Sequence, residues 1–430
     1  MPQTEKRKRR GLFARKRVRR DPGQSQARGQ SQARGQSQAR GQSQARGQSR
    51  GQGVRPLAAG RMDLPFLLLT LLLTIMGLVM LFSASFPSAN YESGDPAYYL
   101  KRQGLFALLG LAAMLAMARI DYHRLRGMTK ILMYVSVFLL ALVLVPGVGI
   151  TQNGATRWLG KAGVLTFQPS EIAKLAIIVY FADSISKKKN LMENFKYGVR
   201  PYILILGFFA GLMLLEPHLS GTILIVGTGI VLMIVGGLDK RWIIGGISGV
   251  AAVGLIYVKL VEAGIISYGA DRIRMWKDPW IDALDEGYQM CQSLIAIGSG
   301  GLTGVGLGKG RQKFLYLPEE HNDFIFAVVC EELGLIGATL VMLVFALLIL
   351  RGFWIALQAR DRFGALLVVG VMTQISLQTF LNIAVVSGLV PATGISLPFF
   401  SYGGTALALQ LFEMGIVLSV SRQIPAPRGG

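Results

Sequence analysis

Long apolar stretches recur along most of this chain, and they constrain its fold more than any other feature of the sequence. From Leu64 onward there are ten of them, several about 20 residues long, the length that crosses the hydrocarbon of a bilayer. Because lipid offers no partners to backbone N–H and C=O groups, only helices and closed barrels can span it. Only 16% of the residues are charged, below the ~25% typical of soluble domains. The sequence therefore predicts an all-α, polytopic membrane protein with about ten transmembrane helices.

The predicted spans divide the chain into segments. They cover residues 64–85, 104–117, 131–148, 170–184, 202–215, 219–238, 242–261, 323–350, 364–389 and 396–420. We expect a basic tail at 1–61, a transmembrane domain at 62–423, and a C-terminal tail at 424–430. Within the domain, residues 262–322 form one large loop between the seventh and eighth helices, and so long a connection is usually functional.

Lysine and arginine in the connections predict the orientation, because cytoplasmic loops carry an excess of both. Segments 119–130 and 187–200 hold four and five of these residues, whereas the connections at 101–102 and 157–161 hold two each. This asymmetry places both termini in the cytoplasm and the large loop 262–322 on the extracytoplasmic side.

The N-terminal tail accounts for most of the net charge of +21, since residues 1–61 hold 17 Lys/Arg and two acids. Its Gly-Gln-Ser-Gln-Ala-Arg unit recurs four times between Gly23 and Arg46 and contains nothing that could build a core, so we predict disorder. A solvated tail that fixes topology is the favoured interpretation. An electrostatic tether to anionic lipid is the functional alternative, and we expect no nucleic-acid partner.

The large loop contains two features of its own. Residues 287–297 are apolar enough to lie in the membrane interface or re-enter it, and the glycine-rich stretch 298–308 follows. These glycines permit tight turns and close backbone approach. Both a phosphate cradle and a flexible hairpin remain open, although no Gly-Lys-Ser/Thr completes a Walker pattern.

Ionisable residues near the spans are functional candidates, because charge in a membrane is costly. Asp323 begins the eighth span and could serve chemistry or merely cap the helix, unless Asn322 supplies that cap. Glu332, deeper in the same span, could be a buried partner for a cation such as Lys174. We interpret His218 as a hydrogen-bonded connector, and the two cysteines, Cys291 and Cys330, as small apolar residues.

These residues also carry a resemblance to a known family. The motifs are Asn153–Trp158, Phe167–Lys174, Trp276–Trp280, Gly287–Gln289, Gln292–Ser293, Ala296–Gly301, Gly306–Gly308, Gln312–Lys313, Leu317–Glu319, His321–Ala327, Glu331–Gly334, Pro391–Gly394 and Pro398–Gly404. In this order the chain resembles the SEDS family, which includes the FtsW, RodA and SpoVE groups, over roughly residues 64–423, and most resembles the FtsW-like branch. Asn322 stands where the family commonly has Thr, and Glu216-Pro-His replaces a Gln-Pro-Asp type motif.

The resemblance implies a function as well as a SEDS-type fold. Members are peptidoglycan glycosyltransferases of the bacterial inner membrane that polymerise lipid II, for division or other cell-wall synthesis, with inversion to a β-1,4 linkage. Asp323 would be the catalytic general base. The implied substrate or pyrophosphate contacts are Arg157, Trp158, Arg272, Arg274, Lys309, Lys313, Glu319, His321 and Glu332. The implied structural motif residues are Pro169, Ser170, Lys174, Pro391, Gly394, Pro398, Ser401 and Gly403.

The expected partners are lipid II, a class B penicillin-binding protein and other division or elongation proteins. No cofactor is certain, and a divalent cation, Mg²⁺ or Mn²⁺, at the pyrophosphate is an expectation by analogy with other phosphate leaving groups. A lipid II flippase and a membrane scaffold are the alternative functions. A flippase predicts charges lining a pathway on both sides of the midplane, whereas most candidates here belong to the outer side.

Overall fold

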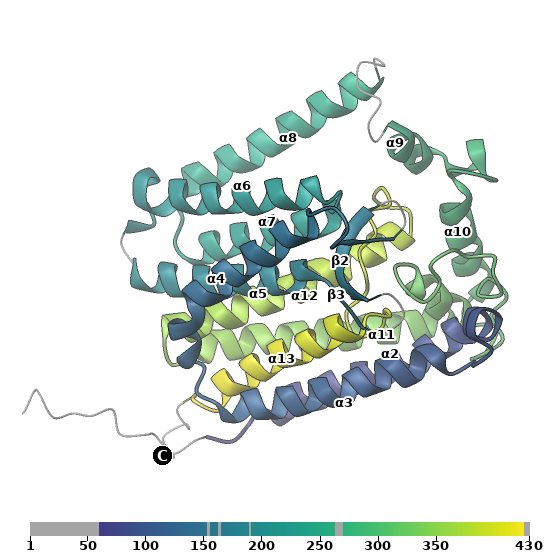
Figure 1. The fold of residues 1–430 in the computed structure, drawn as a ribbon, viewed down its shortest axis with the longest axis horizontal. Coiled ribbons are helices and arrows are strands. Elements are labelled where there is room, and N and C mark those ends of the chain that lie inside the picture. The colour runs from purple at the N-terminus through teal and green to yellow at the C-terminus, as the bar shows by residue number, and fades with distance from the viewer. Residues whose placement is uncertain (1–59, 153–154, 162–164, 189–190, 263–269, 425–430) are drawn as a thin grey trace, which may run out of the picture. The chain divides into compact units, whose positions relative to one another are not determined.

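The computed structural model describes residues 60–152, 155–161, 165–188, 191–262 and 270–424. The predicted tails at 1–61 and 424–430 lie outside these ranges except for residues 60, 61 and 424. Ten long helices occupy the ten predicted spans (Figure 1). They are α2 (Leu64–Ser93), α3 (Tyr98–Arg119), α4 (Arg124–Val143), α5 (Pro169–Lys187), α6 (Arg200–Leu215), α7 (Leu219–Val235), α8 (Lys240–Glu262), α11 (Ile325–Gln358), α12 (Arg362–Val386) and α13 (Gly404–Ser421).

Length and composition support membrane crossing for most of them. Within the described ranges, α2, α3, α4, α11, α12 and α13, together with the segment Phe195–Leu215, are seven helical segments long and apolar enough to span a bilayer. The segment Phe195–Leu215 joins the π-helical turn η2 (Phe195–Val199) to α6. The predicted class, a helical multi-pass membrane protein, is confirmed.

Two connections contain structure that hydropathy did not predict. Three short antiparallel strands, β1 (Ile150–Gln152), β2 (Ala155–Lys161) and β3 (Leu165–Phe167), form a sheet in the order β1-β2-β3. The large loop contains α9 (Ala270–Lys277), η3 (Pro279–Asp282) and α10 (Tyr288–Gly300). The expectation of an entirely helical chain therefore missed the sheet, because strands this short carry too few residues to show a clear alternation. Figure 1 shows β2, β3 and α10 near the same end of the helices, called here the Asp323 end.

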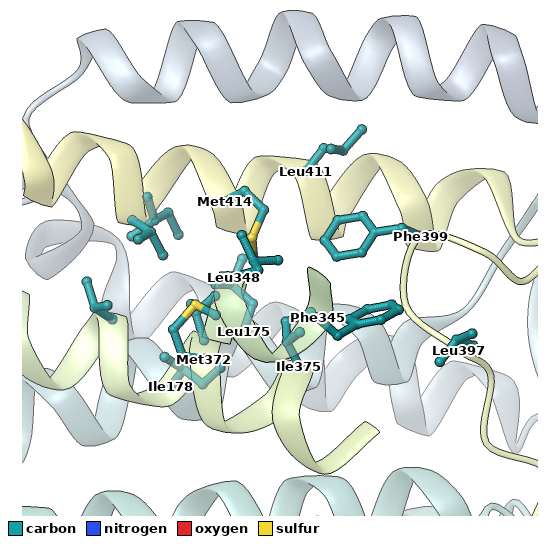
Figure 2. Close-up of a cluster of buried hydrophobic side chains, with 14 of the residues drawn as sticks. Leu175, Ile178, Phe345, Leu348, Met372, Ile375, Leu397, Phe399, Leu411 and Met414 are labelled. Atoms are coloured by element: carbon teal, nitrogen blue, oxygen red, sulfur yellow. The ribbon is translucent and has the colours of Figure 1, made fainter. Parts of the chain in front are cut away.

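The core lies around α12, which packs between α5, α11 and α13. In the most apolar window of α12, 72% of the residues are buried, against 22% in α4, so α12 is a central helix and α4 is peripheral. Figure 2 shows part of this core, with side chains from α5, α11, α12 and α13 converging on one apolar cluster. The labelled residues are Leu175, Ile178, Phe345, Leu348, Met372, Ile375, Leu397, Phe399, Leu411 and Met414.

Helix α11 is broken near its start, at Gly334, where φ is 67° and ψ is −171°. The glycine-rich stretch docks at this break and takes over the backbone hydrogen bonds. The N–H groups of Val305 and Gly306 donate to the carbonyls of Glu331 and Glu332, both at 3.0 Å. In return, Leu335 and Ile336 beyond the break donate to the carbonyls of residues 301 and 302, at 2.9 and 3.1 Å. The stretch is therefore an ordered part of the helical wall, and the flexible-hairpin interpretation is wrong.

Close backbone contact explains why glycine stands at these positions. A Cβ on Gly304 would lie 2.2 Å from the Glu332 carbonyl oxygen, and one on Gly300 would lie 2.0 Å from that of Cys330. A Cβ on Gly334 would meet the Gly304 nitrogen at 2.2 Å. Side chains at these three positions would separate the loop from the helix.

Two glycines with nearly the same backbone angle allow a matched test. Gly304 has φ of +78° and Gly308 has φ of +79°, but only Gly304 has backbone atoms where a Cβ would stand. Both alanine variants incur a left-handed penalty of about 1 kcal/mol or more, and Gly304→Ala adds an overpacking cost of ~1–3 kcal/mol. We expect Gly304→Ala to unfold at a clearly lower temperature than Gly308→Ala, measured on the detergent-solubilised chain. Equal unfolding temperatures would contradict the docking of this loop on α11.

Candidate active site

Asp323 lies in the turn that leads into α11, and neighbouring elements hold its main chain. The amide of Asn382 on α12 donates to the carbonyl oxygens of Asp323, at 2.7 Å, and Ile395, at 2.6 Å. One residue earlier, the carbonyl of Asn322 accepts from the Ser401 hydroxyl at 2.7 Å. The turn is thus fixed by side chains of α12 and of the segment before α13.

The carboxylate of Asp323 is not used as a helix cap. Phe324 is the N-cap of α11, and no side chain donates or accepts a capping hydrogen bond there. The amide of Asn322 donates to Glu319 instead. Both capping interpretations, by Asp323 and by Asn322, are therefore wrong.

Burial and nearby charges set the protonation of Asp323. Burial raises its pKa most, the carboxylate of Glu319 raises it further, and the nearby Arg157 and His321 oppose both, with a result of about 6. A carboxyl of this pKa is still mainly ionised at neutral pH, and it is a stronger base than an aspartate at its reference value of about 3.9. The arrangement suits a general base.

Arg157 joins this acid to a second group of ionisable residues. It projects from β2 and donates to the carbonyl of Pro217 in the connection between α6 and α7. In that connection burial raises the pKa of Glu216 to about 7, against the opposing charge of Arg157. Burial, helped by Arg157 and Lys174, lowers the pKa of His218 to about 3, so its ring is neutral.

The main chain of His218 links two helices, and its ring lies 3.4 Å from the side-chain nitrogen of Gln168. The main-chain N–H of His218 donates to the carbonyl of Met213 at 2.9 Å, and its own carbonyl accepts from both the N–H and the hydroxyl of Thr222. These bonds link the end of α6 to the start of α7.

The motif residues between α12 and α13 surround the Asp323 turn. A Cβ on Gly394, whose φ is +70°, would stand 3.2 Å from Asp323 Oδ2, so glycine keeps the space beside the carboxylate open. The Ser401 hydroxyl accepts from the N–H of Leu397 at 2.7 Å. Gly403 donates to Gln103 of α3 at 3.1 Å. Pro391 lies partly buried before Gly394, and Pro398 is buried.

Two adjacent acids on α11 anchor the large loop. Glu331 accepts from the main-chain N–H of Arg311, at 2.7 Å, and that of Gln312, at 3.3 Å. Glu332 pairs with the ammonium of Lys313 at 2.6 Å, and both contact the hydroxyl of Ser83 on α2. Lys313 and Glu332 are each under 3% exposed. This pair therefore joins α2, the loop and α11, and we do not assign it to substrate phosphate.

The partner suggested for Glu332 was wrong. Lys174, near the start of α5, pairs with Glu171 one turn earlier at 2.8 Å, and both are buried. Pro169 and Ser170 form the first turn of α5 and are buried as well. This end of α5 therefore carries an internal ion pair.

The remaining predicted residues are spread over the Asp323 end. Trp158 is partly buried in β2 and pairs in register with Ile150. His321 lies against Tyr99 in the first turn of α3, with ring centroids 4.5 Å apart. Arg274 is exposed on α9, Lys309 is exposed directly after the glycine-rich stretch, and the side chain of Arg272 lies outside the described residues. The structure thus brings Arg157, Glu319 and His321 close to Asp323.

Sequence reasoning missed three supporting side chains. Asn382 had a visible signal, because it is an amide inside an apolar span, where polar groups are usually functional. Glu216 was noted only as part of a chain break, although it faces the same arginine as Asp323. Ser83 had no signal, since small hydroxyl residues are common in membrane helices.

The described residues contain no group of three or more His, Cys, Asp or Glu side chains placed to hold a metal ion. Glu319 and Asp323 are the acids closest to the proposed chemistry, and two carboxylates leave most of an octahedral shell to other ligands.

Comparisons with known proteins place this arrangement in a family. The family model FTSW_RODA_SPOVE, described as "Cell cycle protein", matches residues 63–425. Stage V sporulation protein E of Bacillus subtilis is 43% identical over 361 residues, which cover 84% of this chain and 97% of that protein. The probable peptidoglycan glycosyltransferase FtsW of Geobacter sulfurreducens is 42% identical over 365 residues, covering 85% and 96% of the two chains.

Two solved structures share the fold at 29% sequence identity. A chain from a peptidoglycan synthase complex, described as coordinating polymerization and crosslinking, matches with a TM-score of 0.70 over 84% of this chain and 98% of its own. The rod shape determining protein RodA of Thermus thermophilus matches with a TM-score of 0.62 over 85% and 98%.

The buried pair supports a prediction of stability. Glu332→Gln leaves the ammonium of Lys313 buried beside a neutral amide, and breaking such pairs costs ~3–5 kcal/mol. Asp95→Asn is the matched control, because the exposed Asp95–Lys101 pair, at 2.7 Å, is screened by solvent and contributes little to stability. We expect the apparent unfolding temperature to fall strongly only for Glu332→Gln, and the double variant Glu332→Leu/Lys313→Met to recover most of the loss. A Glu332→Gln protein as stable as Asp95→Asn would refute this role.

Proposed function

The chain belongs to the FtsW/RodA/SpoVE family of cell cycle proteins, and we propose that it is a peptidoglycan glycosyltransferase that polymerises lipid II into glycan strands. Relatives at about 40% identity carry that activity in their names. The single observation that carries the proposal in this structure is the Asp323 carboxylate. It is uncapped, partly accessible, raised in pKa, and surrounded by family motif residues.

The proposed step is a displacement at the anomeric carbon of the donor sugar. Asp323 accepts the proton of the C4 hydroxyl on the acceptor GlcNAc, and that oxygen forms a bond to C1 of the donor MurNAc. The bond from C1 to the diphosphate oxygen breaks, and undecaprenyl diphosphate leaves with the electron pair. Attack opposite the leaving group converts an α-linked donor to a β-1,4 product. Asp323 then releases its proton to solvent.

Neighbouring residues support the base in this scheme. Arg157 and His321 favour the ionised form of Asp323, while Glu319 raises its pKa towards neutrality. Gly394 leaves room beside the carboxylate for an incoming hydroxyl. A general base contributes about 10²- to 10⁴-fold to a rate, so positioning and stabilisation of the departing diphosphate supply the rest.

A divalent cation, Mg²⁺ or Mn²⁺, fits this reaction only if it binds together with the substrate diphosphate. Two carboxylates, Glu319 and Asp323, do not make a protein cage, so the diphosphate oxygens and water would complete the coordination. Such an ion would neutralise charge on the leaving group. We derive no step through it.

The proposed setting is the bacterial inner membrane, with both termini cytoplasmic and the Asp323 end outside. The likeness to a peptidoglycan synthase complex supports a class B penicillin-binding protein as the partner that crosslinks the strands, together with other division or elongation proteins. Anionic lipid is the proposed contact of the basic tail.

Removing the proposed base tests the mechanism directly. We expect Asp323→Asn to lower lipid II polymerisation by about 10²- to 10⁴-fold, measured as long glycan product from the purified chain with its penicillin-binding partner. Asp95→Asn, an exposed acid of the α2–α3 connection, should retain nearly full activity. Equal activity of wild type and a folded Asp323→Asn protein would rule out this assignment.

The pH profile provides a second test. The base must be ionised, so activity should fall as the pH decreases through about 6, the pKa of Asp323. Glu319→Gln removes a like charge and should move this acid limb to lower pH. Arg157→Gln removes an opposite charge and should move it to higher pH. Limbs that stay fixed in both variants would show that another group titrates.

A further inference from the structure

A cavity lies beside the break in α11, separate from the residues that surround Asp323. Its volume is about 430 Å³, and its lining residues are Ser299, Val305, Lys309, Arg311 and Glu331. Small-molecule sites typically occupy ~300–1,000 Å³, so a diphosphate with part of its substituent would fit. Ser299 lies in the last turn of α10, and Val305, Lys309 and Arg311 belong to the loop that follows it and docks on α11.

The wall of this cavity is held by bonds already described. Val305 donates its N–H to the Glu331 carbonyl, at 3.0 Å. The Glu331 carboxylate accepts from the Arg311 N–H, at 2.7 Å, and from that of Gln312. The acid in the lining is thus directed to main-chain donors, and it fixes the backbone from which the Arg311 side chain projects.

Lys309 and Arg311, the two cations of the cavity, differ in their pairing from Lys313 and Lys101. Lys313 is neutralised by Glu332 and Lys101 by Asp95. By contrast, the side chains of Lys309 and Arg311 are exposed and form no ion pair or hydrogen bond with any described residue. Two cations therefore line one cavity, and guanidinium and ammonium groups together suit phosphate oxygens.

Exposed apolar side chains lie close in the chain to the cations of the cavity. Leu302 is 66% exposed and Leu307 is 53% exposed, and both precede Lys309 in the chain. Phe314, Leu315 and Tyr316, which follow Arg311 closely, are exposed as well. Apolar and aromatic side chains beside basic ones are typical of a membrane interface, where cations reach the phosphate level. A ligand with an anionic head and a hydrocarbon tail matches both features.

We propose that the cavity formed by Ser299, Lys309 and Arg311 binds the diphosphate of a polyprenyl-diphosphate-linked substrate, at a subsite distinct from the Asp323 base. The class of lipid rests on the proposed function. Lys309 and Arg311 neutralise the diphosphate, and the exposed leucines contact the first isoprene units.

A binding measurement that does not need catalysis tests this subsite. The full-length chain is placed in nanodiscs of phosphatidylcholine, and labelled undecaprenyl diphosphate is the probe. The variant Lys309→Gln/Arg311→Gln should bind about 10- to 100-fold more weakly, as expected for losing charge-assisted hydrogen bonds. Lys101→Gln, which removes an exposed cation elsewhere on the same end, is the matched control and should bind like wild type. The charge-preserving variant Lys309→Arg/Arg311→Lys should retain most of the affinity.

Competition and a catalytic variant separate the outcomes. Unlabelled undecaprenyl diphosphate should displace the probe, whereas excess phosphatidylglycerol should not. Displacement by phosphatidylglycerol at equal concentration would show a general phospholipid contact and overturn the proposal, as would unchanged binding by the double glutamine variant. Asp323→Asn should bind the probe normally even though it does not polymerise. A failure of the glycosyltransferase proposal would therefore appear in the product assay and leave this binding unchanged.

Discussion

Backbone hydrogen bonds must be satisfied inside a membrane, and the break in α11 is where this requirement shapes the site. At Gly334 the helix loses its own i→i−4 bonds, and each orphaned group costs several kcal/mol in lipid. The glycine-rich stretch supplies both donors and acceptors across the break. These backbone hydrogen bonds hold the loop on the helix. They therefore also fix the position of Lys309 and Arg311, which the loop carries.

Glu331 and Glu332 hold the large loop on α11, whereas Asp323 has no such structural role. Glu331 is occupied by main-chain N–H groups, and Glu332 by an ammonium and a hydroxyl. Both are buried, where a carboxylate needs such partners. Asp323 differs, since neighbouring elements hold its main chain while its carboxylate is influenced by burial and by the charges of Glu319 and Arg157. A rigid backbone with an accessible carboxylate is what proton transfer requires, because geometry must be fixed while the protonation state changes.

Hydropathy predicted the ten helices because a helix that crosses lipid must be apolar along its length. It could not predict the sheet, whose strands are three to seven residues long. It also could not predict the partner of Glu332. The expectation of a buried ion pair was right, but Lys313 lies in a loop that folds back onto α2 and α11, and sequence spacing contains no information about that return. Asp323 was found through motif resemblance, whereas its pKa depends on Glu319 and Arg157, which only the fold brings together.

The opposite end of the helices bears on the flippase alternative. Asp361 caps α12 through the N–H of Gly364, at 3.0 Å, and accepts from Tyr122, at 2.6 Å, and Arg126, at 3.1 Å. His123 lies 3.1 Å from the same carboxylate. These bonds join α12 to the α3–α4 connection and to the start of α4. The groups that form them are therefore already paired. A transport path would require charges on both sides that can exchange partners with a moving headgroup. Since Asp361, Tyr122, His123 and Arg126 are bonded to one another at that end, while Lys309 and Arg311 at the other end form no ion pair with any described residue, the charge distribution favours chemistry on one face over passage between two.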